Sequence, residues 1–213
     1  MNYCQSFCRT IQRLCNSAGG GLPAEYQQVE YLQSTGSQWI DTGINNTTPI
    51  EYYVKVKRDG GNMAVFGTWN NNGRLFLAFD GVGNLQIGYS TSYYTGGYVG
   101  SAAEHEISGV LQSGAQTGYI DGTLSVNQSN TSAITPAATI PLFALRNTQN
   151  NTIYQYLTGR IYAFTLSSAG TKILDFVPCY RKSDSKPGMY DLVTNTFFTN
   201  AGSGEFTVGA DVN

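Results

Sequence analysis

The stretch "NMAVFGTWNNNGRLFLAFDGVGNLQIGYS", residues 62–90, contains three runs of strand-forming residues separated by two turn signals. The separators are residues 70–73 (Asn-Asn-Asn-Gly) and 80–84 (Asp-Gly-Val-Gly-Asn). Asn, Asp and Gly tolerate the left-handed backbone conformation that tight hairpins require, and the apolar and aromatic residues between them suit a pleated, half-buried surface. The stretch therefore predicts three consecutive antiparallel strands joined by two hairpins.

The same alternation of strand-like runs and turn signals extends over most of the chain. Turn signals recur about every 8–12 residues, among them residues 59–61 (Asp-Gly-Gly) and the two-residue hairpin loop Asp121-Gly122. With 25 Gly, 15 Tyr and 10 Phe in 213 residues, the composition supplies both the turns and the packed sheet surfaces. The pattern predicts an all-β protein, a two-sheet antiparallel sandwich, and the length favours a jelly roll over an immunoglobulin-like domain.

Charge and hydropathy argue against several classes of partner. The formal net charge is −2 and the 12 Lys and Arg residues are scattered, whereas binding to a phosphate backbone needs clustered cations. We therefore expect no nucleic acid partner. The chain lacks an apolar run of about 18 residues, so no membrane span is expected, and its N-terminus lacks the basic-then-apolar pattern of a signal peptide.

The first 18 residues have a different pattern from the rest. Residues 2–21, "NYCQSFCRTIQRLCNSAGGG", predict an amphipathic α-helix over residues 1–18, followed by a Gly-rich hinge over residues 19–25. So short a helix is marginal alone in water, so its apolar stripe must meet copies of itself, the body of the domain or another protein. A zinc site is disfavoured because no His or Asp lies nearby, and the thiols are expected to be reduced. The predicted partner-docking residues are Cys4, Phe7, Cys8, Ile11, Leu14 and Cys15.

Two motifs resemble a known family. "GYIDGTLS" (118–125) and the later "GRIYAFTLSSAG" (159–170) look like the paired signatures of concanavalin A-like, LamG-type jelly rolls. Residues 22–44 and 175–206 resemble, more narrowly, jelly-roll domains encoded in phages and prophages of gut bacteria, usually within virion structural or host-contact proteins. The resemblance implies a jelly roll over residues 26–208 with a tail at 209–213, and it leaves the predicted helix outside.

Residues 172–200 form an unusually polar stretch for a chain that is only 12% charged. We interpret it as a structural clasp in which "RKSDSKPG", residues 181–188, forms a polar turn whose Pro187-Gly188 fits a chain reversal. A second hairpin is expected to turn at Thr194-Asn195. Asp175 or Asp191 is expected to anchor a loop by accepting backbone N–H bonds.

An enzymatic function is not expected. Glycoside hydrolases need two carboxylates about 5–10 Å apart, and the nearest approach to such a pair is Glu104 and Glu106, which flank the single histidine, His105. The laminarinase-type pattern Glu-x-Asp-x-x-Glu is absent. A lyase that uses Tyr, His and Arg stays open as an alternative.

The most suggestive binding loop is "GYSTSYYTGGYVGS", residues 88–101, because Tyr mixed with Ser and Gly gives large contact area at low entropic cost. "GTWNNNGR" (67–74) adds a Trp beside polar amides, which suits the faces and hydroxyls of sugars. The alternative is that these aromatic residues fold under a Gly-rich loop. No cofactor or metal is expected, since no clustered Asp/Asn ligand loop appears. The candidate ligand-binding residues are Trp69, Asn71, Tyr93, Tyr94 and Tyr98.

These observations favour a non-enzymatic phage virion structural protein, such as a capsid decoration protein, a head fibre or a tail-associated protein. Its N-terminal helix would join other virion proteins or a homo-oligomer, and its lectin-like jelly roll would face outward for glycan contact. The expected location is the virion, assembled in the host cytoplasm. The alternatives are a carbohydrate-active enzyme on the same fold, either hydrolase or lyase, and a bacterial lectin-like adhesin, against which the missing export signal counts.

Overall fold

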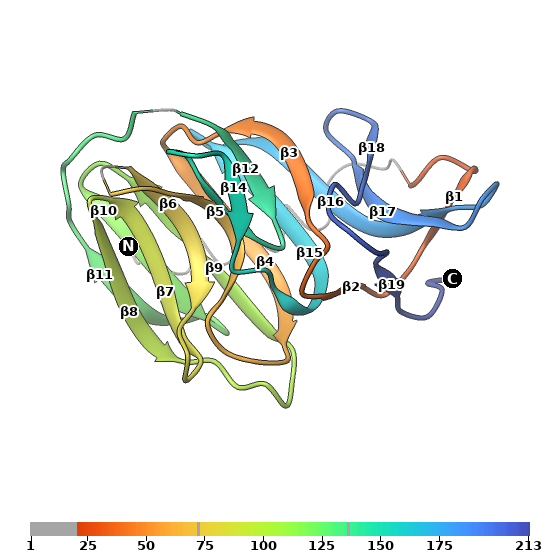
Figure 1. Ribbon diagram of the computed structural model, residues 1–213, viewed down its shortest axis with the longest axis horizontal. Coiled ribbons are helices and arrows are strands. Elements are labelled where there is room, and N and C mark those ends of the chain that lie inside the picture. The colour runs from red at the N-terminus through yellow and green to blue at the C-terminus, as the bar shows by residue number, and fades with distance from the viewer. Residues whose placement is uncertain (1–20, 72, 136) are drawn as a thin grey trace, which may run out of the picture.

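The computed structural model describes residues 21–71, 73–135 and 137–213 (Figure 1). Within these residues every regular element is a β-strand, and the strands form two sheets that pack face to face. The expected all-β, two-sheet antiparallel sandwich is therefore confirmed. The predicted N-terminal helix lies outside the described residues, and so do its docking residues Cys4, Phe7, Cys8, Ile11, Leu14 and Cys15.

The larger sheet has eleven strands in the described part of the chain, with the main order β11-β10-β9-β4-β15-β16-β17-β18. Three short strands pair beside this path: β1 with β16, β2 with β15, and β19 with β2. The strands are β1 (Tyr26–Gln28), β2 (Leu32–Thr35), β4 (Ile50–Arg58), β9 (His105–Gln112), β10 (Ala115–Ile120), β11 (Thr123–Gln128), β15 (Thr158–Ser168), β16 (Thr171–Arg181), β17 (Lys186–Asp191), β18 (Thr196–Thr199) and β19 (Thr207–Val208).

The smaller sheet has eight strands in the described residues, with the main order β14-β13-β5-β6-β7-β8, and β12 pairs with both β3 and β5. Its pairings are antiparallel except the one between β13 and β5, which is parallel. The strands are β3 (Ile40–Asn45), β5 (Met63–Trp69), β6 (Arg74–Phe79), β7 (Asn84–Ser90), β8 (Ser92–Tyr98), β12 (Thr139–Leu142), β13 (Leu145–Asn147) and β14 (Thr152–Tyr154).

The hairpins form where the turn residues predict them. Residues 62–90 give β5, β6 and β7 as a three-stranded antiparallel meander. In the turn after β6, Asp80 Oδ1 accepts hydrogen bonds from the backbone N–H groups of residues 82, 83 and 84 at 3.0, 2.8 and 2.8 Å. Between β10 and β11, Asp121 and Gly122 both have positive φ, 50° and 77°, the conformation of a two-residue hairpin whose twist matches the flanking strands.

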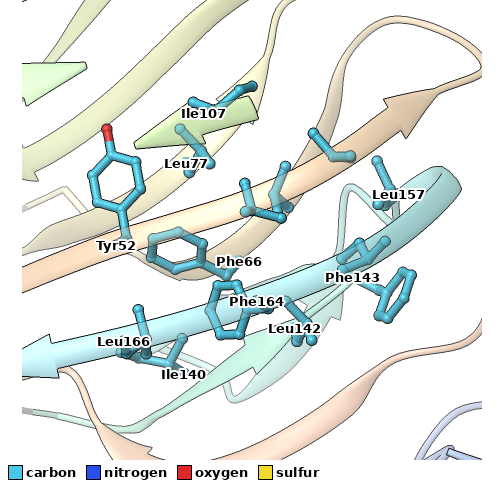
Figure 2. Close-up of a cluster of buried hydrophobic side chains, with 14 of the residues drawn as sticks. Tyr52, Phe66, Leu77, Ile107, Ile140, Leu142, Phe143, Leu157, Phe164 and Leu166 are labelled. Atoms are coloured by element: carbon cyan, nitrogen blue, oxygen red, sulfur yellow. The ribbon is translucent and has the colours of Figure 1, made fainter. Parts of the chain in front are cut away.

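The hydrophobic core lies between the two sheets. Along β4, buried residues alternate strictly with half-buried ones, because successive side chains of a strand point to opposite faces. Tyr52 and Phe164 from the larger sheet point toward Phe66 from the smaller one (Figure 2), with ring centroids 5.6 and 5.4 Å from that of Phe66. The buried Tyr52 hydroxyl donates to the Thr117 carbonyl oxygen at 3.0 Å, and burial raises the pKa of Tyr52. This interdigitated aromatic layer joins the sheets.

The polar stretch 172–200 forms the predicted clasp. Strands β16, β17 and β18 form consecutive antiparallel pairs, and β1 and β19 lie at the same end of the molecule (Figure 1). The hairpin at Thr194-Asn195 is confirmed, and Asn195 has a φ of 55°. Asp191 is the residue that accepts the backbone N–H bonds, including that of Asp175 at 2.8 Å.

The polar turn expected within residues 181–188 is present, but its expected reversal at Pro187-Gly188 is wrong, because both residues lie within β17, opposite Tyr180 and Cys179. The chain turns earlier, over residues 182–185, where Ser185 takes the left-handed conformation with φ 55°. Gly188 serves close packing instead, since a Cβ there would lie 2.2 Å from the carbonyl oxygen of residue 198.

The tail predicted at residues 209–213 runs along the start of the jelly roll. Backbone hydrogen bonds join Gly209 N to Tyr31 O at 3.0 Å and Val212 N to Gln28 O at 3.0 Å. At the end of the predicted hinge, Glu25 O accepts from Lys182 N at 2.9 Å. The start of the described domain is therefore fastened to the clasp, and the C-terminal tail is fastened to the start of the domain.

Cys179 of β16 is fully buried, and burial raises its pKa to about 12 against the opposing effect of a hydrogen bond from the backbone of Tyr190. An unfolded thiol ionises near pH ~8.5, so between about pH 8.5 and 12 the unfolded state loses its proton first and the free energy of unfolding falls, by about 1.4 kcal/mol per pH unit. Below that window both states hold the proton, and the thiol has no effect on the pH dependence.

We predict that Cys179→Ala removes part of the alkaline loss of stability. Between pH 7 and pH 10 the free energy of unfolding of the unaltered chain should fall by about 2 kcal/mol more than that of the variant. Urea denaturation at the two pH values, with reductant present, measures the difference. The other ionising groups are common to both chains and cancel, so equal losses would contradict burial of this thiol.

Candidate functional site

The outward face of the smaller sheet carries a second apolar cluster, separate from the main core. Its buried members are Ala64, Phe76, Ala78 and Leu145, and Trp69 and Tyr154 pack against it half-buried. Phe76 lies over Gly88 of the neighbouring strand, where a Cβ would come within 2.2 Å of the Phe76 ring. A glycine opposite an aromatic residue thus lets the Phe76 ring lie flat on the sheet.

Arg74 links the aromatic residues at one edge of this cluster. Its guanidinium carbon is 5.8 Å from the ring centroid of Trp69 and 5.8 Å from that of Tyr93, and Nη1 donates to the carbonyl oxygen of Thr91. A guanidinium within about 6 Å of an aromatic face is attracted by the ring quadrupole. Arg74 therefore holds residues from β5 and β8 together across β6 and β7.

Tyr154 of β14 completes this surface. Its ring packs edge-on against Trp69, with centroids 6.3 Å apart and an interplanar angle of 74°. Burial raises the pKa of Tyr154 to about 12, and the charge of Arg74 opposes this shift. The phenol is therefore neutral at physiological pH, and we call Trp69, Arg74, Tyr93 and Tyr154 the aromatic surface.

The five predicted ligand-binding residues occupy three environments. Trp69 ends β5 half-buried, Asn71 is exposed in the turn that follows, and Tyr93 is 56% exposed on β8. Tyr94 points inward, opposite Ile87, and packs against the main core. Tyr98 is 63% exposed at the far end of β8, where Arg58 lies 5.3 Å from its ring centroid.

A β-bulge sets the direction of the tyrosines on β8. Asn84 pairs with Tyr98 and Gln86 with Thr95, so Gly96 and Gly97 together oppose one residue of β7. The extra residue restores the outward direction, and Tyr93 and Tyr98, five positions apart, face the same side. At about 3.3 Å per residue they lie about 16 Å apart along the strand. The structure thus joins Trp69, Asn71 and Tyr93 at one end and leaves Tyr98 at the other.

Glu104, one of the two acids considered for catalysis, and His105 both have structural partners. Glu104 forms an ion pair with Lys55 at 2.6 Å, and His105 Nδ1 lies 2.7 Å from Asp121 Oδ2. Asp121 Oδ1 also accepts from the backbone N–H of Glu106 at 2.9 Å. Slight burial raises the pKa of Asp121, but the hydrogen bonds from His105 and the Glu106 backbone outweigh it and hold the pKa below its usual value. These contacts fix the β10–β11 hairpin against the start of β9.

Two further features bear on function. Across residues 21–71, 73–135 and 137–213, no three His, Cys, Asp or Glu side chains gather as a metal site would require. No helix in the same residues is long and apolar enough to cross a membrane.

No protein-family model matches the chain, and no curated protein matches it. The sandwich is similar to solved structures. A protein of Bacteroides ovatus ATCC 8483, for which carbohydrate binding has been proposed, aligns with a TM-score of 0.61 and 10% identity over 87% of this chain. Domains LG4-5 of the mouse laminin α1 chain align with a TM-score of 0.50 and 12% identity over 73%. The native heptameric SAP-like pentraxin of Limulus polyphemus aligns with a TM-score of 0.50 and 10% identity over 91%.

These similarities show the fold class of the chain, which is an antiparallel jelly-roll sandwich. More narrowly, the chain has the concanavalin A-like, LamG-type fold that its two motifs predict. It covers 62% of the Bacteroides protein and 44% of the laminin chain, so it spans less than two thirds of either, but it covers 91% of the pentraxin. The likeness of residues 22–44 and 175–206 to phage domains stays a prediction.

Sequence reasoning missed Arg74 and Tyr154. The signal for Arg74 was present, since it begins a strand two residues before Phe76 and therefore shares its face. Tyr154 comes from β14, which pairs antiparallel with β13, and the parallel β13–β5 pairing brings this strand pair beside Trp69. No local pattern indicates that contact.

Proposed function

We propose that this protein is a non-enzymatic, lectin-like jelly roll that contacts glycans through the aromatic surface. The observation that carries the proposal is the exposed Tyr93 ring. The guanidinium of Arg74 contacts both this ring and that of Trp69 on one outward sheet face. Aromatic faces offer apolar contact to a sugar ring at low entropic cost, while guanidinium and amide groups serve hydroxyls. The exposed Asn71 amide lies next to this surface in the chain.

The fold supports the same function. A jelly-roll neighbour is a protein with a proposed carbohydrate-binding role, and this chain covers most of its own length in that alignment. Fold alone does not transmit function, so the argument depends on the aromatic surface itself. That surface is prearranged, because Arg74 is bonded to the backbone of Thr91 and Trp69 packs on Tyr154. Prearranged side chains lose less entropy when a ligand binds.

We predict that Trp69→Ala and Tyr93→Ala each weaken glycan binding at least about tenfold, which corresponds to 1.4 kcal/mol. Binding of the full chain to an array of host surface polysaccharides and bacterial glycans identifies the ligand, and titration of the variants against it measures the effect. Tyr180→Ala on the clasp is the matched control and should bind like the unaltered chain. Unchanged binding in both surface variants would contradict the proposed site.

The proposal that the protein is not an enzyme has its own test. Incubation of the chain with the glycans that it binds should release no product. Product release that disappears in Glu104→Gln or Glu106→Gln would instead assign a carbohydrate-active enzyme.

We further propose that the chain is a virion protein of a phage, joined by residues 1–18 to other virion proteins or to copies of itself, with the jelly roll facing outward. The layout of an apolar-striped segment, a Gly-rich segment and a sandwich supports this, together with the resemblance at residues 22–44 and 175–206. Light scattering on the full chain beside residues 22–213 should show an oligomer only for the former. If both the full chain and residues 22–213 are monomeric, and both are incorporated into particles equally well, the proposed role of residues 1–18 is wrong.

A further inference from the structure

The larger sheet forks on its outward face, where β16 leaves β15. Residues 164–168 of β15 pair with β16, but residues 158–161 pair with β2 on that side. Beyond Phe176, β16 pairs with β17 and β1 instead. Because the two long strands diverge, the sheet surface is hollowed there by a pocket of ≈ 260 Å³.

A β-bulge shapes one wall of this pocket. Ile161 pairs with Val56 and Ala163 with Lys55, so Tyr162 is an extra residue of β15. The bulge directs two consecutive side chains, Tyr162 and Ala163, toward the pocket that both of them line. Bulges of this kind re-aim side chains beside binding sites, and here the bulge sits at the fork.

The polar side of the pocket is a row of residues in register across three strands. Tyr53 of β4 pairs with Thr165 of β15, which pairs with Asp175 of β16, so their side chains share the outward face. Lys172 Nζ lies 2.7 Å from Asp175 Oδ2, and the two side chains are 19% and 23% exposed. All four residues line the pocket.

Asp175 is held rigidly in this row. Its backbone N–H donates to the buried Asp191 carboxylate at 2.8 Å, and its carbonyl oxygen accepts from Leu192 N at 2.9 Å. Asp175 Oδ2 accepts a hydrogen bond from the Lys172 ammonium, while Asp175 Oδ1 accepts from no donor in the part of the chain that the structure describes. The carboxylate therefore presents a fixed acceptor toward the pocket, and fixed polar groups bind with less loss of entropy.

The size and charge of the pocket define its ligand. Its volume lies just below the range of about 300–1,000 Å³ that holds drug-sized molecules, so one ring fits and a chain of rings does not. Lys172 and Asp175 compensate each other's charge, which disfavours an ionic ligand. A donor and an acceptor side by side suit neighbouring hydroxyl groups, and the tyrosine rings and Val177 supply apolar contact.

We propose that this pocket binds one uncharged, polyhydroxylated ring: a monosaccharide or the terminal residue of a glycan. It is a second site on the other sheet, formed from different residues than the aromatic surface, and it does not depend on ligand binding there. With both sites, one jelly roll would engage two parts of a glycan or two glycans.

Saturation-transfer NMR on the full chain with glucose, galactose, mannose and N-acetylglucosamine tests this proposal, with glucuronate as the charged probe. At least one neutral sugar should bind, and Asp175→Asn, which replaces an acceptor oxygen by a donor group, should weaken it at least tenfold. Thr165→Val, nearly the same size, should weaken it severalfold. Circular dichroism and thermal unfolding confirm that both variants fold.

The outcome separates this site from the aromatic surface. Tyr180→Ala, which lies in neither site, should leave monosaccharide binding unchanged. If monosaccharide binding survives in both Asp175→Asn and Thr165→Val but is lost in Trp69→Ala, the proposed pocket site is wrong. The aromatic surface then remains the proposed binding site. Preference for glucuronate, or no binding of any neutral sugar at tens of millimolar, would also overturn the pocket site.

Discussion

Replacing Phe164 by alanine is expected to lower the free energy of unfolding by about 3–5 kcal/mol, among the largest effects that a single core truncation produces. Phe164 lies in the middle of β15 and is fully buried. Its ring centroid is 5.4 Å from that of Phe66 in the other sheet and 6.2 Å from that of Phe176 in its own. Alanine would remove the contact between the layers at its centre and leave a cavity that two stiff sheets cannot close (Figure 2).

Urea denaturation followed by fluorescence measures this loss. Tyr98→Ala is the matched control, since it truncates an aromatic side chain that is 63% exposed and whose ring contacts the Arg58 guanidinium. Its expected cost is under about 1 kcal/mol. Since whole domains are stable by only about 5–15 kcal/mol, Phe164→Ala should also shift the urea midpoint strongly. A loss as small as that of Tyr98→Ala would contradict the central position of Phe164 in the core.

The sequence contained most of the information needed for the sandwich, because its strands follow local rules. Asp121-Gly122 and Asp80 specify their turns through backbone conformation and through hydrogen bonds within four residues. The fork between β15 and β16 follows no local rule. It arises because β2, more than 120 residues earlier in the chain, pairs with β15 in place of β16. The misplaced reversal at Pro187-Gly188 has a similar cause, since Gly188 is needed for close packing of β18 and not for a turn.

The candidate site was less accessible to sequence reasoning. Tyr93 and Tyr94 are adjacent residues of the same type, so the sequence does not show which of them faces outward. The register of β8 against β7 directs Tyr93 outward and Tyr94 into the core. The bulge at Gly96-Gly97 then reverses the alternation before Tyr98. Arg74 joins residues of strands that are not neighbours in the sheet. The face to which a strand residue points, and the residues it contacts on neighbouring strands, both depend on the pairing register. A single sequence indicates this register only through the turns that can be recognised in it.

The clasp depends on one buried carboxylate, that of Asp191. It is fully buried and accepts four hydrogen bonds: from Asp175 N at 2.8 Å, Val193 N at 3.2 Å, Thr194 N at 3.0 Å and Thr194 Oγ1 at 2.6 Å. Together these fix the turn between β17 and β18 and join it to β16. A buried carboxylate is costly unless hydrogen bonds satisfy it, and here they do.

We predict that Asp191→Ala lowers the free energy of unfolding by at least about 3 kcal/mol, because a buried donor left without its acceptor costs about 1–3 kcal/mol and the variant leaves several. Asp184→Ala, in the neighbouring turn of the same clasp, is the matched control. Asp184 forms a two-point ion pair with Arg181, but both side chains are more than 40% exposed, and such pairs contribute little. Urea denaturation should therefore separate two aspartates seven positions apart in the chain. Equal losses would mean that the Asp191 hydrogen bonds do not hold the clasp, and that its stability comes from the strand pairing alone.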